Sequence, residues 1–239
     1  MLKRHISDSV KRLMTMCGAR FPARAVHGFV ASANYVRLGR WMADHGFVFV
    51  RRETSRTGVF DRMLERAADR RVLYLEFGVW EGASMKYWSR RLRHPGSRLH
   101  GFDSFEGLPQ TGGFWEKGQF DLEGVMPTVD DPRVTFFKGW FEDVLPHYEP
   151  PEHDLLVINL DADLYSSTIH VLRHLRPIMK PGTIVYFDDM PAVEHEPRAI
   201  HEFLLETRQV WKPLAADRSL EHAAFEIVDA GLPVDNVAN

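Results

Sequence analysis

The stretch that most constrains the fold is residues 154–165, DLLVINLDADLY. Residues 155–160 form a short apolar run that only Asn159 interrupts. Such a run is typical of a strand that is covered on both faces of a parallel sheet. Asp161 and Asp163 follow where this strand should end. Because ligands bind beyond the carboxyl ends of the strands in open α/β sheets, these acids are candidates for a functional site.

A second segment repeats this layout. Residues 183–187, TIVYF, predict a strand that leads directly into Asp188 and Asp189. If the two strands are neighbours, Asp161, Asp188 and Asp189 meet at one rim of the sheet. Clustered carboxylates repel one another unless protons or a cation hold them, and oxygen ligands suit Mg²⁺. The alternative is that such acids are helix caps or turn residues, but two matched strand ends favour a site.

The remaining chain alternates predicted strands and helices. This alternation predicts βαβ units, and hence a doubly wound, mostly parallel seven-stranded α/β sheet. We divide the chain into a helical N-terminal extension, 1–55, and a main domain, 56–239. The predicted strands are 72–77, 99–102, 134–137, 155–160, 183–187, 211–215 and 223–228. The predicted helices of the main domain are 59–68, 83–92, 166–178 and 196–209, with a short helical turn at 139–146.

The composition is that of an ordinary globular protein, with 44% hydrophobic and 26% charged residues among 239. The net charge of −3 argues against a general nucleic-acid binder. A single cysteine, Cys17, excludes an internal disulfide framework and any zinc site built on several cysteines. No apolar run approaches the roughly 20 residues that span a bilayer. We therefore expect a cytoplasmic protein.

The N-terminus departs from this average. Residues 1–41 hold eight Lys or Arg and one acid, Asp8, and their apolar residues fall at spacings of three and four. This pattern predicts an amphipathic helix over 1–20 and a looser one over 24–45. Three interpretations stay open: a helix that packs on its own domain or on another subunit of a homo-oligomer, a peripheral membrane helix, and a transit peptide.

A long connection, 104–130, separates the second and third strands of the main domain. It contains five glycines and four aromatic residues, Phe105, Phe114, Trp115 and Phe120. A loop of this length in a compact domain is usually functional or disordered. The aromatic residues favour a lid over a substrate, and a plain surface excursion is the alternative.

The ends of the first two strands indicate a nucleoside-type cofactor. In LEFGVWEGAS, 75–84, Gly78 and Gly82 let the backbone pass close to a ligand, and Ser84 lies at the start of the next helix. Glu76 is an acid inside an apolar strand, which is costly unless a group such as a ligand ammonium bonds it. Asp103, with Ser104, follows the second strand, where an acid can accept hydrogen bonds from ribose hydroxyls. Because GxGxxG is missing, S-adenosylmethionine is favoured over a dinucleotide.

These motifs resemble a family. The chain is similar to the class I S-adenosylmethionine-dependent methyltransferases, which have a Rossmann-like fold, and among them to the macrocin O-methyltransferase group. The same spacing resembles the catechol and caffeoyl-coenzyme A O-methyltransferases. The resemblance covers roughly 72–190 and is carried by LEFGVWEGAS, GFDSFEGLP (101–109), FFKGWFEDVLP (136–146), LDADLYSST (160–168) and YFDD (186–189).

The resemblance implies roles for individual residues. Asp103 and Ser104 would hold the ribose, and Trp140 and Phe141 would flank the adenine. The residues near the methionine part would be Glu76, Gly78, Trp80, Gly82 and Ser84. Mg²⁺ would be bound by Asp161, Asp188 and Asp189, and would take two vicinal substrate oxygens. Asp161 could also receive the proton, and the alternative bases are His147, His153, His195 and His201.

Three positions depart from the related patterns. Leu164 stands where the catechol-type enzymes have a lysine, and Asp188 and Asp189 replace their Asp-Asn pair, as in the macrocin group. Ala162 stands where that group usually has glycine. Residues 1–55 and 191–239 carry no resemblance, so the acceptor does not follow from it.

We therefore expect a Mg²⁺-dependent O-methyltransferase that acts on a sugar or another polyhydroxylated small molecule. Three alternatives stay open: a metal-independent methyltransferase acting on another nucleophile, a nicotinamide-dependent oxidoreductase, and a non-catalytic module that binds an adenosyl ligand. The missing GxGxxG disfavours the oxidoreductase, and a binding module has no need of three clustered acids.

Overall fold

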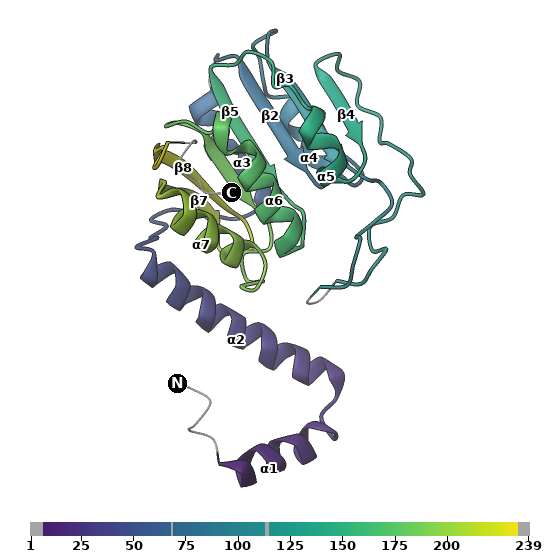
Figure 1. The fold of residues 1–239 in the computed structure, drawn as a ribbon, viewed down its shortest axis with the longest axis vertical. Helices are drawn as coiled ribbons and strands as arrows, with labels where there is room; N and C mark the ends of the chain where they lie inside the picture. Colours follow the sequence, from purple (N-terminus) through teal and green to yellow (C-terminus); the bar gives the residue numbers. More distant parts are fainter. Residues whose placement is uncertain (1–6, 68, 113–114, 234–239) are drawn as a thin grey trace.

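The computed structural model describes residues 7–67, 69–112 and 115–233. It contains one eight-stranded sheet of order β1-β7-β8-β6-β5-β2-β3-β4 (Figure 1). All seven predicted strands are confirmed. The prediction of seven was short by one, because β1 lies in a polar stretch, 51–58, at the predicted boundary between the N-terminal extension and the main domain. The strands are β1 (Arg52–Glu53), β2 (Val72–Phe77), β3 (Arg98–Asp103), β4 (Val134–Lys138), β5 (Leu155–Leu160), β6 (Ile184–Phe187), β7 (Val210–Asp217) and β8 (Ala223–Asp229).

The sheet is mostly parallel, and its register brings the acids together. Within it, only β8 runs antiparallel to its neighbours, β6 and β7. Leu160 at the end of β5 pairs with Phe77 of β2 on one side and with Phe187 of β6 on the other. The residues that follow these three strand ends, among them Asp161 and Asp188, therefore lie at the same edge of the sheet.

Helices cover both faces of the sheet, as expected for a doubly wound fold. On one face, α3 (Arg56–Ala67) packs through Phe60 against Tyr186, and α4 (Ala83–Ser89) packs through Trp88 against Tyr74. On the other, α5 (Phe141–Val144), α6 (Tyr165–Leu175) and α7 (Glu196–Thr207) cover Leu73, Leu75 and Phe77. Figure 1 shows α6 and α7 in front of the strands. Short 3₁₀ helices, η2 (Leu145–His147) and η3 (Arg176–Ile178), extend α5 and α6.

The N-terminal extension is helical, as predicted, and projects from the domain (Figure 1). It consists of α1 (Asp8–Gly18) and α2 (Ala23–Asp44), and residues 1–6 of the predicted first helix lie outside the described residues. No residue of α1 is buried. The C-terminal part of α2 reaches the core through Leu38, which is fully buried. No helix in the described part of the chain is long and apolar enough to cross a membrane.

The long connection between β3 and β4 folds back onto the end of β3. The backbone N–H groups of Leu122 and Gly124 donate to the carbonyl oxygen of Phe105 at 3.2 and 2.7 Å. Phe105 itself is buried. Phe114, one of the four aromatic residues in the lid prediction, lies outside the described residues.

Candidate active site

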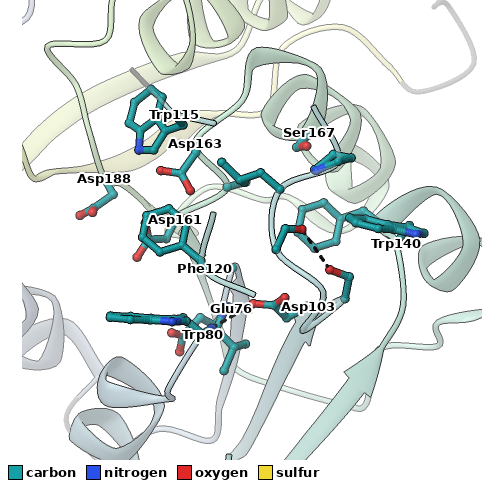
Figure 2. Close-up of a pocket in the computed structure, with 18 of the residues that line it drawn as sticks. Glu76, Trp80, Asp103, Trp115, Phe120, Trp140, Asp161, Asp163, Ser167 and Asp188 are labelled. Carbon is teal, nitrogen blue, oxygen red and sulfur yellow. Dashed lines mark hydrogen bonds between the residues drawn. The ribbon is translucent and has the colours of Figure 1, made fainter. Parts of the chain in front are cut away.

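A cavity of about 780 Å³ opens at the carboxyl ends of β2, β3, β5 and β6 (Figure 2). Every predicted site residue except Gly82 lines it. The predicted residues that line the cavity are Glu76, Gly78, Trp80, Ser84, Asp103, Ser104, Trp140, Phe141, Asp161, Asp188 and Asp189. The predictions drawn from separate strand ends therefore converge on one space.

The two glycines after β2 have different roles. Gly78 has φ +87°, and a Cβ there would lie 1.8 Å from the carbonyl oxygen of Asp161. Only glycine fits this crossing between the ends of β2 and β5. Gly82, at φ +73°, is the N-cap of α4 and lies against Pro127 outside the cavity. It shapes the start of the helix rather than the wall of the site.

Asp103 holds the loop that follows β2. Its Oδ2 accepts the backbone N–H groups of Val79 at 2.7 Å and Trp80 at 2.9 Å, and its Oδ1 accepts that of Phe105 at 2.7 Å. Each carboxylate oxygen can accept more than one hydrogen bond, so lone pairs remain for ribose hydroxyls. Asp103 therefore organises the loop and can still face a ligand.

Glu76 lies at the end of a buried polar chain. Asn159 Nδ2 donates to the hydroxyl oxygen of Tyr74 at 2.8 Å, and that hydroxyl donates to Glu76 Oε2 at 3.0 Å. Burial raises the pKa of Glu76 to about 8, although Arg56 and the Tyr74 hydroxyl oppose this rise. A ligand ammonium at this position would favour the ionised carboxylate.

Three carboxylates gather at the rim of β5 and β6. Asp161, Asp163 and Asp189 each place an oxygen within 4.8 Å of the others. Burial, together with the charges of neighbouring carboxylates, raises the pKa of Asp161 to about 8, of Asp163 to about 9 and of Asp189 to about 6. Figure 2 shows Asp161 and Asp163 on the same side of the cavity, beneath Trp115.

Asp188, the third acid of the predicted magnesium site, is bonded differently. Its Oδ1 accepts the Tyr186 hydroxyl at 2.6 Å and lies 2.5 Å from His222 Nδ1. Burial opposes ionisation, yet His222, Arg56 and Tyr186 together lower the pKa of Asp188. Asp163 thus joins the candidate ligands, and the composition of the ligand set stays a prediction.

Arg56 is one of the residues of the site that the sequence prediction missed. It is the first residue of α3, and its Nη2 donates to Asp161 Oδ2 at 2.5 Å. Its Nε lies 3.8 Å from Asp188 Oδ1 and has no hydrogen-bond partner among the described residues. The guanidinium also lies over the rings of Phe60 and Tyr186. Nothing in the polar stretch 51–58 distinguishes this arginine from its neighbours.

We call Asp161, Asp163 and Asp189 the acid rim, and its chemistry suits a hard divalent cation. All three clustered ligands are carboxylate oxygens, the donors that Mg²⁺ prefers. Their raised pKa values result from burial and from mutual repulsion, and a bound cation would offset both by stabilising the ionised carboxylates. The fixed positive charge nearby is Arg56, and it contacts Asp161 and Asp188 rather than Asp163 or Asp189.

Aromatic side chains surround the mouth of the cavity. Trp80 and Phe120 meet edge to face with ring centroids 5.7 Å apart and remain 46% and 37% exposed. Trp115 lies edge to face with His195 at 5.4 Å. The long connection therefore lines the cavity, as a lid would, and its movement stays a prediction.

The histidines predicted as alternative bases lie elsewhere. His195 Nδ1 accepts the backbone N–H of Tyr165 at 3.1 Å, and burial lowers its pKa. His201 pairs with His45 at 3.0 Å, and His153 contacts the carbonyl oxygen of Pro151. None of these three lines the cavity, and neither does His147.

Comparison with known proteins gives the following matches. Residues 75–190 match a family model described as a methyltransferase domain. A tetracenomycin-C rhamnosyl 4'-O-methyltransferase of Streptomyces olivaceus is 32% identical over 54% of this chain and 56% of its own length. The mycinamicin III 3''-O-methyltransferase of Micromonospora griseorubida is 37% identical over 54% of this chain and 59% of its own. The chain thus spans little more than half the length of these curated relatives.

Solved structures share the fold. The O-methyltransferase NovP superposes with a TM-score of 0.51 at 23% identity, covering 72% of this chain and 77% of its own. A calicheamicin methyltransferase superposes with a TM-score of 0.51 at 20% identity, covering 93% of this chain and 94% of its own.

Proposed function

From the match of residues 75–190 to a methyltransferase domain, we propose that this chain transfers a methyl group from S-adenosylmethionine to a hydroxyl of a sugar or another polyhydroxylated small molecule, with the assistance of Mg²⁺. The observation that carries the proposal is the shared cavity. The loop held by Asp103 and the acid rim of Asp161, Asp163 and Asp189 face the same 780 Å³ space. A cytoplasmic location completes the proposal.

The cofactor would lie across the ends of β2 and β3. Glu76 would accept from its ammonium group, and Asp103 from its ribose hydroxyls. Trp140 and Phe141, at the start of α5, would flank the adenine. Methyl transfer is an in-line displacement from sulfonium to oxygen, so the accuracy with which this wall holds the donor contributes much of the rate.

The acid rim would hold the metal and the reacting hydroxyl. Asp161 and Asp189, with Asp163 or Asp188, would bind Mg²⁺, which when bound lowers the pKa of a substrate hydroxyl. Asp161 would accept the hydroxyl proton as the oxygen attacks the methyl carbon. Arg56 would keep Asp161 oriented through its hydrogen bond from Nη2.

The mouth of the cavity suits a hydroxylated ring. Trp80, Phe120 and Trp115 offer aromatic faces to the C–H face of a sugar, while the carboxylates accept its hydroxyl groups. The name of one matched relative describes O-methylation of a rhamnosyl tetracenomycin, which agrees with this chemistry. The acceptor class is inferred from both.

A metal-independent methyltransferase is the second candidate. It is favoured by Arg56, whose guanidinium already lies against Asp161 and Asp188 and could neutralise them without a metal. In that case the acids would position substrate hydroxyls and Asp161 would act without an ion. Turnover that survives exhaustive treatment with a chelator would favour this candidate.

Calorimetric titration tests the proposal. Purified protein is titrated with S-adenosylmethionine and, separately, with NADH, each with and without Mg²⁺. Saturable binding of S-adenosylmethionine without a response to NADH is the expected result, and screening of hydroxylated acceptors would follow. Binding of NADH alone would refute our assignment of the first two strand ends and favour an oxidoreductase.

A further inference from the structure

A single cationic side chain lines a cavity that is otherwise acidic. Among the described residues of the lining, the carboxyl groups are those of Glu76, Asp103, Glu142, Asp161, Asp163, Asp188 and Asp189. Arg56 is the only arginine among these same lining residues, which include no lysine. The potential inside the cavity therefore favours the cationic groups of a ligand, and an anionic group has one complementary side chain to approach.

Arg56 has more donor groups than the protein uses. Its guanidinium carries five N–H donors, and within residues 7–67, 69–112 and 115–233 it makes one hydrogen bond, from Nη2 to Asp161. Nε lies 3.8 Å from Asp188 Oδ1, beyond hydrogen-bond distance, and is buried without a partner among those residues. The side chain is 30% exposed, so a ligand in the cavity can reach its remaining donors.

The guanidinium is held in position before any ligand binds. Arg56 is the first residue of α3, and this helix is anchored in the core by Phe60, which is buried. The guanidinium carbon lies 5.5 Å from the ring centroid of Phe60 and 5.8 Å from that of Tyr186. A planar guanidinium can donate to different carboxylates from different edges. Arg56 can therefore keep its hydrogen bond to Asp161 while it binds a second carboxylate.

This cation lies near the carboxyl group that would hold the ammonium of the cofactor. Burial raises the pKa of Glu76, and the positive charge of Arg56 opposes this rise, so the two side chains are within electrostatic reach of each other. Glu76 and Asp161, the hydrogen-bond partner of Arg56, face the same cavity (Figure 2). The ammonium and carboxylate of an amino acid are attached to one carbon atom. An amino-acid group bound at Glu76 therefore carries its carboxylate close to Arg56.

We propose that Arg56 binds the α-carboxylate of S-adenosylmethionine while Glu76 binds the α-ammonium group of the same molecule. This inference rests on the proposed function and adds a residue to its cofactor site. S-adenosylmethionine has two positive groups, the sulfonium and the ammonium, which suit the acidic lining, and one carboxylate, which suits Arg56. Because Arg56 also bonds Asp161, one guanidinium connects the cofactor to the residue that would accept the proton.

Calorimetric titration with two ligands isolates the contribution of the carboxylate. The full chain is titrated with S-adenosylmethionine and with its decarboxylated analogue, which keeps the ammonium and the sulfonium, in the presence of a chelator. The wild type should bind S-adenosylmethionine at least ten-fold more tightly than the analogue. Arg56→Met should lose this preference, because the carboxylate then has no cationic partner. The matched control Arg62→Met, on the same helix but paired with Glu53 and Glu65, should keep it.

Each outcome of these titrations separates the two proposals. Equal affinity of the wild type for both ligands overturns the role of Arg56, whatever the variants do, and leaves the proposed function standing. The role of Arg56 is also overturned by an Arg56→Met chain that is folded by circular dichroism and keeps the wild-type preference. A wild type that binds neither ligand refutes the proposed function itself, and the role of Arg56 with it.

Discussion

Replacing Arg56 with Met tests whether the acid rim is balanced by an internal cation. The methionine keeps an apolar stem near the rings of Phe60 and Tyr186 but removes the positive charge from Asp161 and Asp188. Removing one partner of a buried ion pair typically costs about 3–5 kcal/mol. Because Asp161 can take up a proton in response, we expect the lower end of this range, about 3 kcal/mol.

The loss should be visible in thermal unfolding. For a chain of this size, 1 kcal/mol corresponds to about 2–4 °C, so Tm should fall by roughly 6–12 °C in the presence of a chelator. Millimolar Mg²⁺ should then raise the Tm of the variant more than that of the wild type. The physical reason is that the ion takes over the charge that Arg56 supplied, and ligand binding to the folded state stabilises it.

Arg62→Met is the matched control, since Arg62 lies on the same helix and pairs with Glu53 and Glu65 away from the cavity. Because Arg62 faces solvent, its removal should change Tm only slightly, and the Mg²⁺ response should equal that of the wild type. Equal Mg²⁺-induced stabilisation of the wild type and the Arg56 variant would refute the reasoning. It would mean that the guanidinium and the ion do not share the same carboxylates.

Three further changes have defined outcomes. Gly78→Ala should lower the free energy of unfolding, measured in urea, by more than about 3 kcal/mol, because its Cβ would overlap the carbonyl oxygen of Asp161. The control Gly118→Ala, which has open space around it, should lower it by about 1 kcal/mol. Asp103→Asn should weaken S-adenosylmethionine binding at least ten-fold by calorimetry, since it loses a charged acceptor of backbone N–H groups, and unchanged affinity would contradict the ribose assignment. Burial lowers the pKa of His100 to about 4, so on acidification the unfolded chain binds a proton before the folded chain does. The free energy of unfolding should therefore fall by up to about 3 kcal/mol between pH 6.5 and 4. In His100→Phe this contribution to the pH dependence should be absent.

The sheet and most of the site could be predicted because their signals are local. The run 155–160 is apolar on both faces, and the acids that follow it mark its carboxyl end. A parallel sheet then brings strand ends together without any further information. β1 lacks such a local signal and was missed, because Arg52 and Glu53 form a polar two-residue strand at the edge of the sheet. Such a strand has no apolar pattern to detect.

The unpredicted residues of the site share a different cause. Arg56 bonds Asp161 across 105 positions of sequence, and His222 reaches Asp188 across 34. Neither contact follows from spacing, since each depends on how α3 and the β7–β8 turn pack beside the rim. Gly82 is the converse case, because this glycine of the motif was predicted to face the ligand, whereas the structure places it at the helix start with a positive φ and outside the cavity lining.

Backbone conformation supports the location of the site independently of motifs and relatives. Eight non-glycine residues in the described chain have positive φ, and four of them line the cavity: Trp80, Phe120, Asp163 and Asp189. A non-glycine residue in this region costs of order 1 kcal/mol or more and persists only where surrounding structure enforces it. At Asp163 and Asp189 the strained turn adds to the cost of gathering buried carboxylates. Two destabilising features, backbone strain and clustered buried carboxylates, therefore coincide at this rim. Such a coincidence is expected at a functional site, where local conformational preferences are overridden.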